Sequence, residues 1–498
     1  MMTPAPRLPW PCATIAALML AVALAVRWPL TGDPIAGVDE QFYLLVGDRM
    51  WAGALPYVDI WDRKPVGLFL LYAAFRALPG DGVLAYQLAG AVCLALTGWL
   101  VALIARRTVA WPVAVAAGVV AIALTTLMGQ GLGEAPIFYD PLVAAAAWAV
   151  LRVRDGAGHS TAYGAAAMLA CGIAITIKTV AAFEGMAFGL LLLAAHRRAG
   201  MPTRRLIGRA LAYAAIGIAP TALAALYYAG MGHWADFWFA NVTSILLRSG
   251  GGGEASLVQL VATLLLLGPL LLPAMLALRE RQLPDDRPLL AAWAGATAIG
   301  LVAVGYFPFH YALPMIAPLA ILAARGLPRR GGGAVLTVAL GGAAWLAVAP
   351  SPVARDRADL AVLLGPLPPE VRSQCLLIRE GPAITYHLSH ACLAGRYAFP
   401  GHFTAAGEAE ATGTPRARMT ADALARRPAA IIDVADPPDA ARLAAAGYAP
   451  CRRGSIRLYG AARVMLSVWV RRDLARFWLG KCQNLAPNPV AELKGSEA

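Results

Sequence analysis

Residues 83–107, VLAYQLAGAVCLALTGWLVALIARR, form a continuous apolar run that ends at two arginines. At a rise of about 1.5 Å per residue, a helix of this length crosses a hydrocarbon core of about 30 Å. Roughly ten further apolar segments follow the same pattern, from Ala13–Leu30 to Ala334–Ala349. The sequence therefore predicts a mainly α-helical bundle that spans a membrane about eleven times.

The composition excludes an ordinary soluble multidomain enzyme. Hydrophobic residues make up 59% of the chain and charged residues 14%, with a mean hydropathy of +0.61. Soluble domains usually carry about 25% charged residues. The net charge of +13 indicates no nucleic-acid partner, because the arginines form short clusters between apolar segments rather than a basic face with interleaved aromatic residues.

The arginine clusters predict the orientation of the chain. They fall at every second junction: Arg106-Arg107, Arg152 with Arg154, Arg197 to Arg209, Arg279 to Arg287, and Arg325 to Arg330. Because cytoplasmic loops collect Lys and Arg, we expect this side and the N-terminus to be cytoplasmic, in a cell inner membrane. The loops 31–82, 129–136, 229–256 and 305–312, the junction at Lys178 and the C-terminal tail then face the periplasm.

Two features of the spans allow alternatives. Residues 162–177 and 180–195 are short and meet at Lys178, as a bent or half-crossing pair would. The first segment resembles a cleaved signal peptide, because Ala-Val-Ala-Leu-Ala precedes Val26. Neither alternative changes the side on which the tail lies.

The pattern changes after Pro350. Short strand-like runs at 374–378, 429–434, 455–459 and 464–470 alternate with helix-like stretches at 421–425 and 439–446. We therefore expect a transmembrane domain at 1–350, a small periplasmic α/β domain at 351–482 and a disordered tail at 483–498. Cys375, Cys392, Cys451 and Cys482 lie in this part. One or two disulfides are possible there, and we expect Cys375 to pair with Cys392.

The first outer loop carries the strongest functional signal. An acidic pair, Asp39-Glu40, begins a stretch in which apolar residues recur at helical spacing up to Gly53. A second helix is expected to begin at Pro65 and to bury Val66, Phe69, Leu70 and Ala73. Charged groups at such a depth are candidates for function.

Several motifs of this loop and of later loops resemble a known family. They are the acidic pair, Gly53-Ala-Leu-Pro-Tyr-Val-Asp59, Asp62-Arg63-Lys64-Pro65, a second acidic site at Glu134 to Asp140, Lys178, and His310-Tyr311 opening a late span. The set is similar to bacterial GT-C glycosyltransferases of the protein-mannosyltransferase and aminoarabinose-transferase-like group. Gly395-Arg396-Tyr397 is similar to an Arg-Tyr pair of related tails.

The resemblance implies a sugar transferred from a polyprenyl-phosphate donor to an envelope glycolipid such as lipid A, a glycan or a protein. Asp39 would be the general base, assisted by Glu40, because the acceptor hydroxyl must lose a proton. Arg63, Lys64, Lys178 and His310 would bind the donor phosphate. Asp140, or alternatively Glu134, would orient the acceptor or complete a divalent-metal site with Asp39. No other cofactor is implied.

Each assignment has a structural alternative. Asp39 could cap the helix that follows, and Asp62 the helix at Pro65. Arg63 and Lys64 could extend to lipid phosphates, and Lys178 could neutralise helix carbonyls. Asp140 before Pro141 is typical of a helix start, Glu134 of a solvated loop, and His310 of an interfacial aromatic belt.

Two other functional classes compete with a glycosyltransferase. A lipid or sugar transporter would also contain broken helices and intramembrane charges. The spans show no internal repeat, however, and the acids lie in outer loops rather than at mid-membrane. A non-catalytic assembly factor whose tail binds a partner is the third alternative. A membrane glycosyltransferase remains the preferred interpretation.

Overall fold

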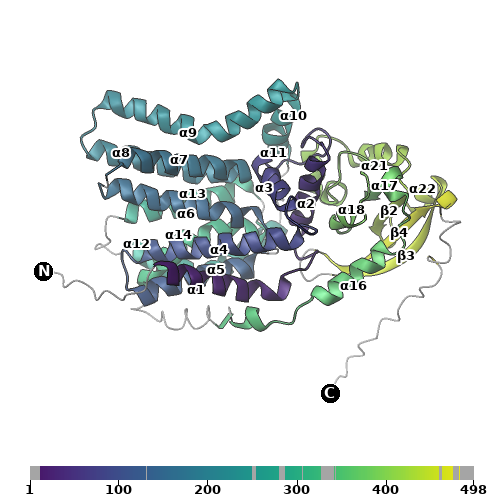
Figure 1. Cartoon of the computed structure of the whole chain (residues 1–498), viewed down its shortest axis with the longest axis horizontal. Coiled ribbons are helices and arrows are strands. Elements are labelled where there is room, and N and C mark those ends of the chain that lie inside the picture. The colour runs from purple at the N-terminus through teal and green to yellow at the C-terminus, as the bar shows by residue number, and fades with distance from the viewer. Residues whose placement is uncertain are drawn as a thin grey trace, which may run out of the picture. The chain divides into compact units, whose positions relative to one another are not determined.

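The computed structural model describes residues 12–129, 132–156, 158–248, 254–279, 286–305, 307–326, 341–342, 344–458, 463–474 and 482. The chain divides into two compact units (Figure 1). The helical unit contains residues up to Gly32 and Arg63–Pro352, and the tail unit contains Asp33–Asp62 and the chain from Val353. The first outer loop is therefore shared between the units, because Asp33–Asp62 group with the C-terminal tail.

The helical unit is a bundle of long helices that lie side by side (Figure 1). They are α1 (Cys12–Arg27), α4 (Val83–Ala105), α5 (Trp111–Met128), α6 (Ala135–Arg154), α7 (Ser160–Ile177), α8 (Ala182–Arg198), α9 (Thr203–Gly230), α12 (Glu254–Arg279), α13 (Arg287–Val304) and α14 (Leu313–Gly326). Shorter elements are η1 (Trp28–Leu30), α3 (Val66–Arg76), η2 (Thr179–Ala181), α10 (Trp234–Trp238), η3 (Phe239–Thr243), α11 (Ser244–Leu247) and η4 (Phe309–Ala312).

The spans agree with the hydropathy pattern. Among the described residues, nine helices are long and apolar enough to cross a membrane, and Phe309–Arg325 is a shorter apolar helix. The helices on both sides of Lys178 are among the nine, so neither needs to be a half-crossing segment. The last expected span, 334–349, lies partly outside the described residues. The chain is a multi-pass membrane protein.

Small residues allow close packing where the helices cross. A Cβ atom at Gly118 of α5 would overlap the backbone carbonyl of Gly98 in α4. Likewise, a Cβ atom at Gly172 of α7 would lie 2.6 Å from the carbonyl oxygen of Gly217 in α9. Membrane helices gain little from hydrophobic burial against lipid, so contacts of this kind hold the bundle together.

The tail unit is a small α/β structure. Its helices are α2 (Val38–Trp51), α16 (Val353–Leu364), α17 (Val371–Gln374), α18 (Ile384–Leu388), α19 (Gly401–Thr404), α20 (Ala406–Ala411), α21 (Arg416–Ala425) and α22 (Ala440–Ala445). Its strands are β1 (Leu376–Ile378), β2 (Ala430–Val434), β3 (Tyr448–Arg457) and β4 (Arg463–Arg471). The strand order is β1-β2-β4-β3; β1 and β2 are parallel, and the other pairs are antiparallel.

The expected strands are present, but the third is longer than its pattern indicated. β3 begins at Tyr448 rather than at Ser455. Its first half contains Pro450 and several arginines, and its pairing with β4 shifts register between Pro450 and Arg452. An edge strand with a bulge tolerates proline, since one of its sides pairs with no strand of the sheet. Because of the proline and the arginines, the first half of β3 lacks the alternation of apolar and polar residues that predicts a strand.

Long-range bonds hold the segment 33–62 in the tail unit. Arg457 of β3 forms ion pairs with Asp33 and with Asp356 of α16. The backbone N–H of Trp61 donates to the Arg396 carbonyl at 2.8 Å, and the centres of the Trp61 and Tyr397 rings lie 5.8 Å apart. The pairing of Cys375 with Cys392 is confirmed, and Cys451 pairs with Cys482.

Candidate functional site

Four cationic side chains of the helical unit surround Tyr311. Arg63 and Lys64 precede α3, Lys178 lies between α7 and η2, and Arg248 ends α11; all four act electrostatically on the Tyr311 hydroxyl. The Lys178 ammonium lies 4.0 Å from the centre of the Tyr311 ring. We call these four residues the cation cluster. Three of its members were predicted from the sequence, and the structure brings them together from separate segments.

The Tyr311 hydroxyl lies in a positive environment. Lys178, Lys64, Arg248 and Arg63 act on it electrostatically and oppose the effect of its burial. Positive charges favour the ionised phenol, and they favour any other anion in the same place for the same reason. The cluster is therefore suited to bind a phosphate.

His310 and Glu134 lie together in the helical unit. The His310 Nδ1 atom is 3.7 Å from a carboxylate oxygen of Glu134. Glu134 is the N-cap residue of α6 and is only 6% exposed, so its interpretation as a solvated loop acid is wrong. Tyr311, beside His310, belongs to the environment of the cation cluster. When His310 is protonated, it forms an ion pair with the Glu134 carboxylate.

Asp140 lies inside α6 rather than at its start. The helix begins at Ala135, with Pro136 in its first turn and Pro141 in its interior. A helix-start interpretation of Asp140-Pro141 is therefore wrong, because an earlier proline takes that position. Asp140 is buried and interacts electrostatically with Glu184 of α8 and with Lys178. Asp140 thus lies near both a second buried acid and a cation.

An apolar pocket adjoins the cation cluster. Its volume is about 260 Å³, and it includes Pro65 and Thr179, the residues that directly follow Lys64 and Lys178. The remaining walls come from α3, α7, α9, α10 and η3, and they include Ile175, Ile218, Trp234, Phe237 and Trp238. A hydrocarbon chain attached to a phosphate at the cations would therefore find an apolar surface in this pocket.

Three acids gather around Tyr43 in the tail unit. Asp39, Glu40 and Asp62 all act electrostatically on the Tyr43 hydroxyl, which donates to Asp39 Oδ2 at 2.7 Å. Burial and these three carboxylates raise the pKa of Tyr43 above its usual range. The hydroxyl therefore stays protonated at neutral pH. The structure thus groups the two predicted catalytic acids with Asp62 and with a tyrosine that was not predicted.

The acids at Asp39 and Asp62 are not helix caps. The N-cap residue of α2 is Gly37, and that of α3 is Pro65, so neither Asp39 nor Asp62 occupies the cap position. The capping alternatives are therefore wrong. α3 buries Phe69 and Ala73 as expected, together with Leu68, Tyr72 and Phe75. Val66 is only partly buried, and Leu70 is 55% exposed.

Gly37 makes room for one of these acids. A Cβ atom at Gly37 would overlap the Glu40 carboxylate, so any larger residue would displace that side chain. Its backbone is extended, with φ at −129°, and so needs no glycine for conformational reasons. Glycine is required here for space alone. Glu40 itself is 1% exposed, which fixes its carboxylate near the start of α2.

Asp39 and Asp140, the carboxylates considered for a divalent cation, belong to different units. Within the described residues, no three His, Cys, Asp or Glu side chains form a group that could hold a metal ion.

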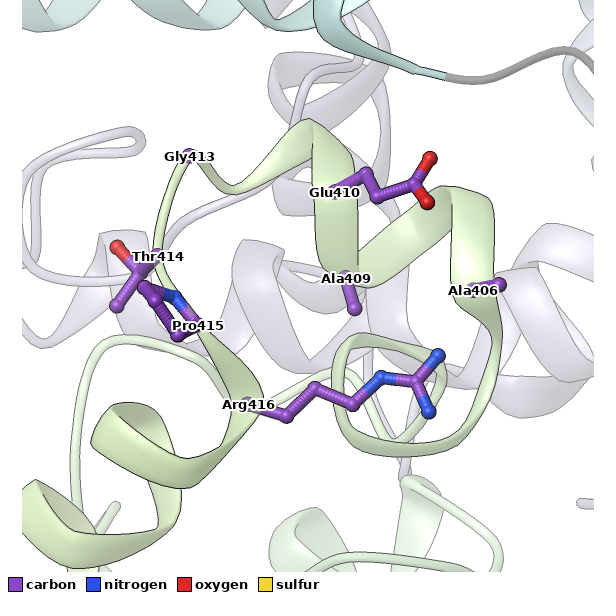
Figure 2. Close-up of a pocket in the computed structure, with 7 residues that line it drawn as sticks. All are labelled: Ala406, Ala409, Glu410, Gly413, Thr414, Pro415 and Arg416. Atoms are coloured by element: carbon purple, nitrogen blue, oxygen red, sulfur yellow. The ribbon is translucent and has the colours of Figure 1, made fainter.

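The tail unit contains another pocket, of about 380 Å³, at the junction of α20 and α21 (Figure 2). Thr414, Glu410 and Arg416 line it, together with Ala406, Ala409, Gly413 and Pro415, and no predicted site residue does.

Comparison with solved structures identifies the fold. The crystal structure of ArnT from Cupriavidus metallidurans bound to undecaprenyl phosphate superposes with a TM-score of 0.62 at 16% identity, over 91% of this chain and 97% of that chain. This chain has a GT-C-like fold. The apo state of the same ArnT gives a TM-score of 0.60 at 16% identity and the same coverage. The apo oligosaccharyltransferase of Archaeoglobus fulgidus gives 0.50 at 14% identity, over 86% of this chain and 70% of that one.

No protein-family model and no curated protein sequence matches the chain. At 16% identity, the ArnT comparison supports the arrangement of helices and not the identity of the substrate.

The structure adds site residues that the sequence did not assign. Tyr311 follows His310 and Tyr43 lies four residues after Asp39, but a neutral side chain gives no charge signal in the sequence. Arg248 precedes a glycine-rich run, of which Gly250–Gly253 lie outside the described residues. Proximity of Arg248 to the other cations needs the tertiary fold.

Proposed function

We propose that this chain is an integral-membrane glycosyltransferase that takes a sugar from a polyprenyl-phosphate donor. The observation that carries the proposal is the cation cluster beside an apolar pocket, both within the helical unit. A polyprenyl phosphate matches both features, since its anionic head needs charge-assisted donors and its hydrocarbon chain needs an apolar surface. ArnT, whose structure was solved with undecaprenyl phosphate, has the same fold and supports this assignment.

The proposed site residues have different roles in the reaction. Asp39 accepts the proton of the acceptor hydroxyl as its oxygen attacks the anomeric carbon of the sugar, and Glu40 assists. The bond between that carbon and the phosphate oxygen breaks, and its electron pair leaves with the polyprenyl phosphate. Arg63, Lys64, Lys178 and His310, joined by Arg248, stabilise the negative charge that develops on the phosphate. Asp140 or Glu134 orients the acceptor.

The finer assignments follow from the resemblance of the motifs. We propose that the enzyme belongs with the protein-mannosyltransferase and aminoarabinose-transferase-like group, and that its acceptor is an envelope glycolipid, a glycan or a protein. Residues 1–350 would form the transferase domain, with the loop 31–82 as its catalytic part, and residues 351–482 a periplasmic domain.

Envelope glycolipids, glycans and proteins from cells with and without this gene test the function by mass spectrometry. We expect one class to lose a single sugar mass in the deletion strain, and the unused polyprenyl-phosphate sugar to accumulate. Restoring the gene should reverse both changes. Unchanged acceptors together with a donor trapped on one side of the membrane would favour a transporter instead.

We propose a periplasmic location for the tail unit. The arginine clusters support it, and so do the two disulfides of this unit, because such bonds form and persist in oxidising compartments. Alkaline phosphatase fused after Gly365 should be active, and fused after Arg329 inactive, in colonies on an indicator substrate. The opposite pattern would reverse the orientation and place the acidic loop in the cytoplasm.

A further inference from the structure

Tyr43 lies one helical turn after Asp39 on the same face of α2. Its hydroxyl donates a hydrogen bond of 2.7 Å to Asp39 Oδ2, and the residue is 2% exposed. Residues four apart in a helix are neighbours, so this contact is fixed by α2 itself and needs no movement of another element.

The surroundings of Tyr43 favour a donor that keeps its proton. Asp39, Glu40 and Asp62 all face the hydroxyl, and ionising it would add a fourth negative charge to the group. From the neighbouring helix α18, His387 faces Asp48 instead, at 3.5 Å. The three carboxylates therefore keep the Tyr43 hydroxyl protonated, and Asp39 accepts its hydrogen bond.

We propose that Tyr43 is the positioning residue of the catalytic base: its hydroxyl fixes the rotation of the Asp39 carboxylate for attack on the donor sugar. This inference rests on the proposed function, in which Asp39 is that base. A carboxylate that turns freely about its Cβ–Cγ bond would spend little time in reach of the acceptor hydroxyl. General-base catalysis requires that geometry before any suitable proton affinity.

Tyr448 offers a matched control. It lies in the same unit, is equally buried at 2% exposed, and donates its hydroxyl to the Pro428 carbonyl at 2.8 Å. Its partner is a backbone oxygen in the sheet region, so Tyr448→Phe removes a buried hydrogen bond without touching an acid. A role in folding alone would make the two variants alike.

The test uses the full chain in detergent, with a polyprenyl-phosphate sugar that the unmodified protein turns over. We expect Tyr43→Phe to lower kcat by about tenfold, the order expected when a hydrogen bond to a charged group is lost, with KM for the donor within about twofold. Tyr448→Phe should keep kcat. Replacing Tyr43 by 3-fluorotyrosine retains the hydroxyl and should restore kcat to within about twofold of normal.

A double-mutant cycle separates positioning from other effects. In an Asp39→Asn background, adding Tyr43→Phe should change kcat little, because the side chain that it orients can no longer take a proton. Additive losses, equal losses from Tyr43→Phe and Tyr448→Phe, or a Tyr43→Phe protein that no longer folds beside a folded Tyr448→Phe protein would each overturn the proposal. An unmodified protein without transferase activity would instead refute the proposed function.

Discussion

Asp39→Asn is expected to lower kcat by about 10²–10⁴-fold, the usual cost of losing a general base, while donor binding is largely retained. The amide keeps the shape of the side chain, and its oxygen can accept the hydrogen bond that the Tyr43 hydroxyl donates to Asp39 Oδ2. Only the capacity to take a proton is lost. Initial rates of purified protein at saturating donor measure the effect.

Asp59→Asn provides the charge control for this prediction. Asp59 lies in the same segment of the tail unit, and its Oδ2 accepts the Leu55 N–H at 2.7 Å, a bond that an amide oxygen can also accept. It should keep near-normal turnover. Near-normal turnover in a correctly folded Asp39→Asn protein would remove Asp39 from the mechanism and direct the search to Glu40, Glu134 or Asp140.

Lys64→Ala is expected to weaken donor binding as well as turnover. Lys64 belongs to the cation cluster around Tyr311 and directly precedes a residue of the apolar pocket. A hydrogen bond to a charged group contributes about 1.5–3 kcal/mol, so the Kd for polyprenyl phosphate should rise by about 10- to 150-fold. Titration of the purified protein with undecaprenyl phosphate, and with undecaprenol lacking the phosphate, measures the change.

Arg204→Ala is the matched control, because it removes the same charge from an exposed position in the first turn of α9. Its Kd should stay within about twofold of normal. The phosphate-free alcohol should bind both variants alike, since it does not use the cations. Equal binding of undecaprenyl phosphate by Lys64→Ala and the unmodified protein would place the phosphate elsewhere.

Local patterns in the sequence determined the elements that carry the site. Apolar runs specified the spans, because a helix in lipid must satisfy its backbone internally and show apolar side chains for its whole length. The limits of α2 followed from its periodicity and from Gly53, whose φ of +90° suits a residue without a side chain. Two cysteines flanking β1, at 375 and 392, were close enough in the chain to suggest their pairing.

Other features depended on contacts between distant residues. Lys64, Lys178, Arg248 and Tyr311 come from four separate segments, and only the packing of the helices brings them together. Asp140 illustrates the same limit at short range, because Pro136 and Pro141 each allow a helix start and the surrounding bundle selects the first. The sequence by itself determined which charges lie at the ends of which helices. Which charges meet was decided by the tertiary structure, since periodicity specifies the buried face of a helix but not the neighbour that covers it.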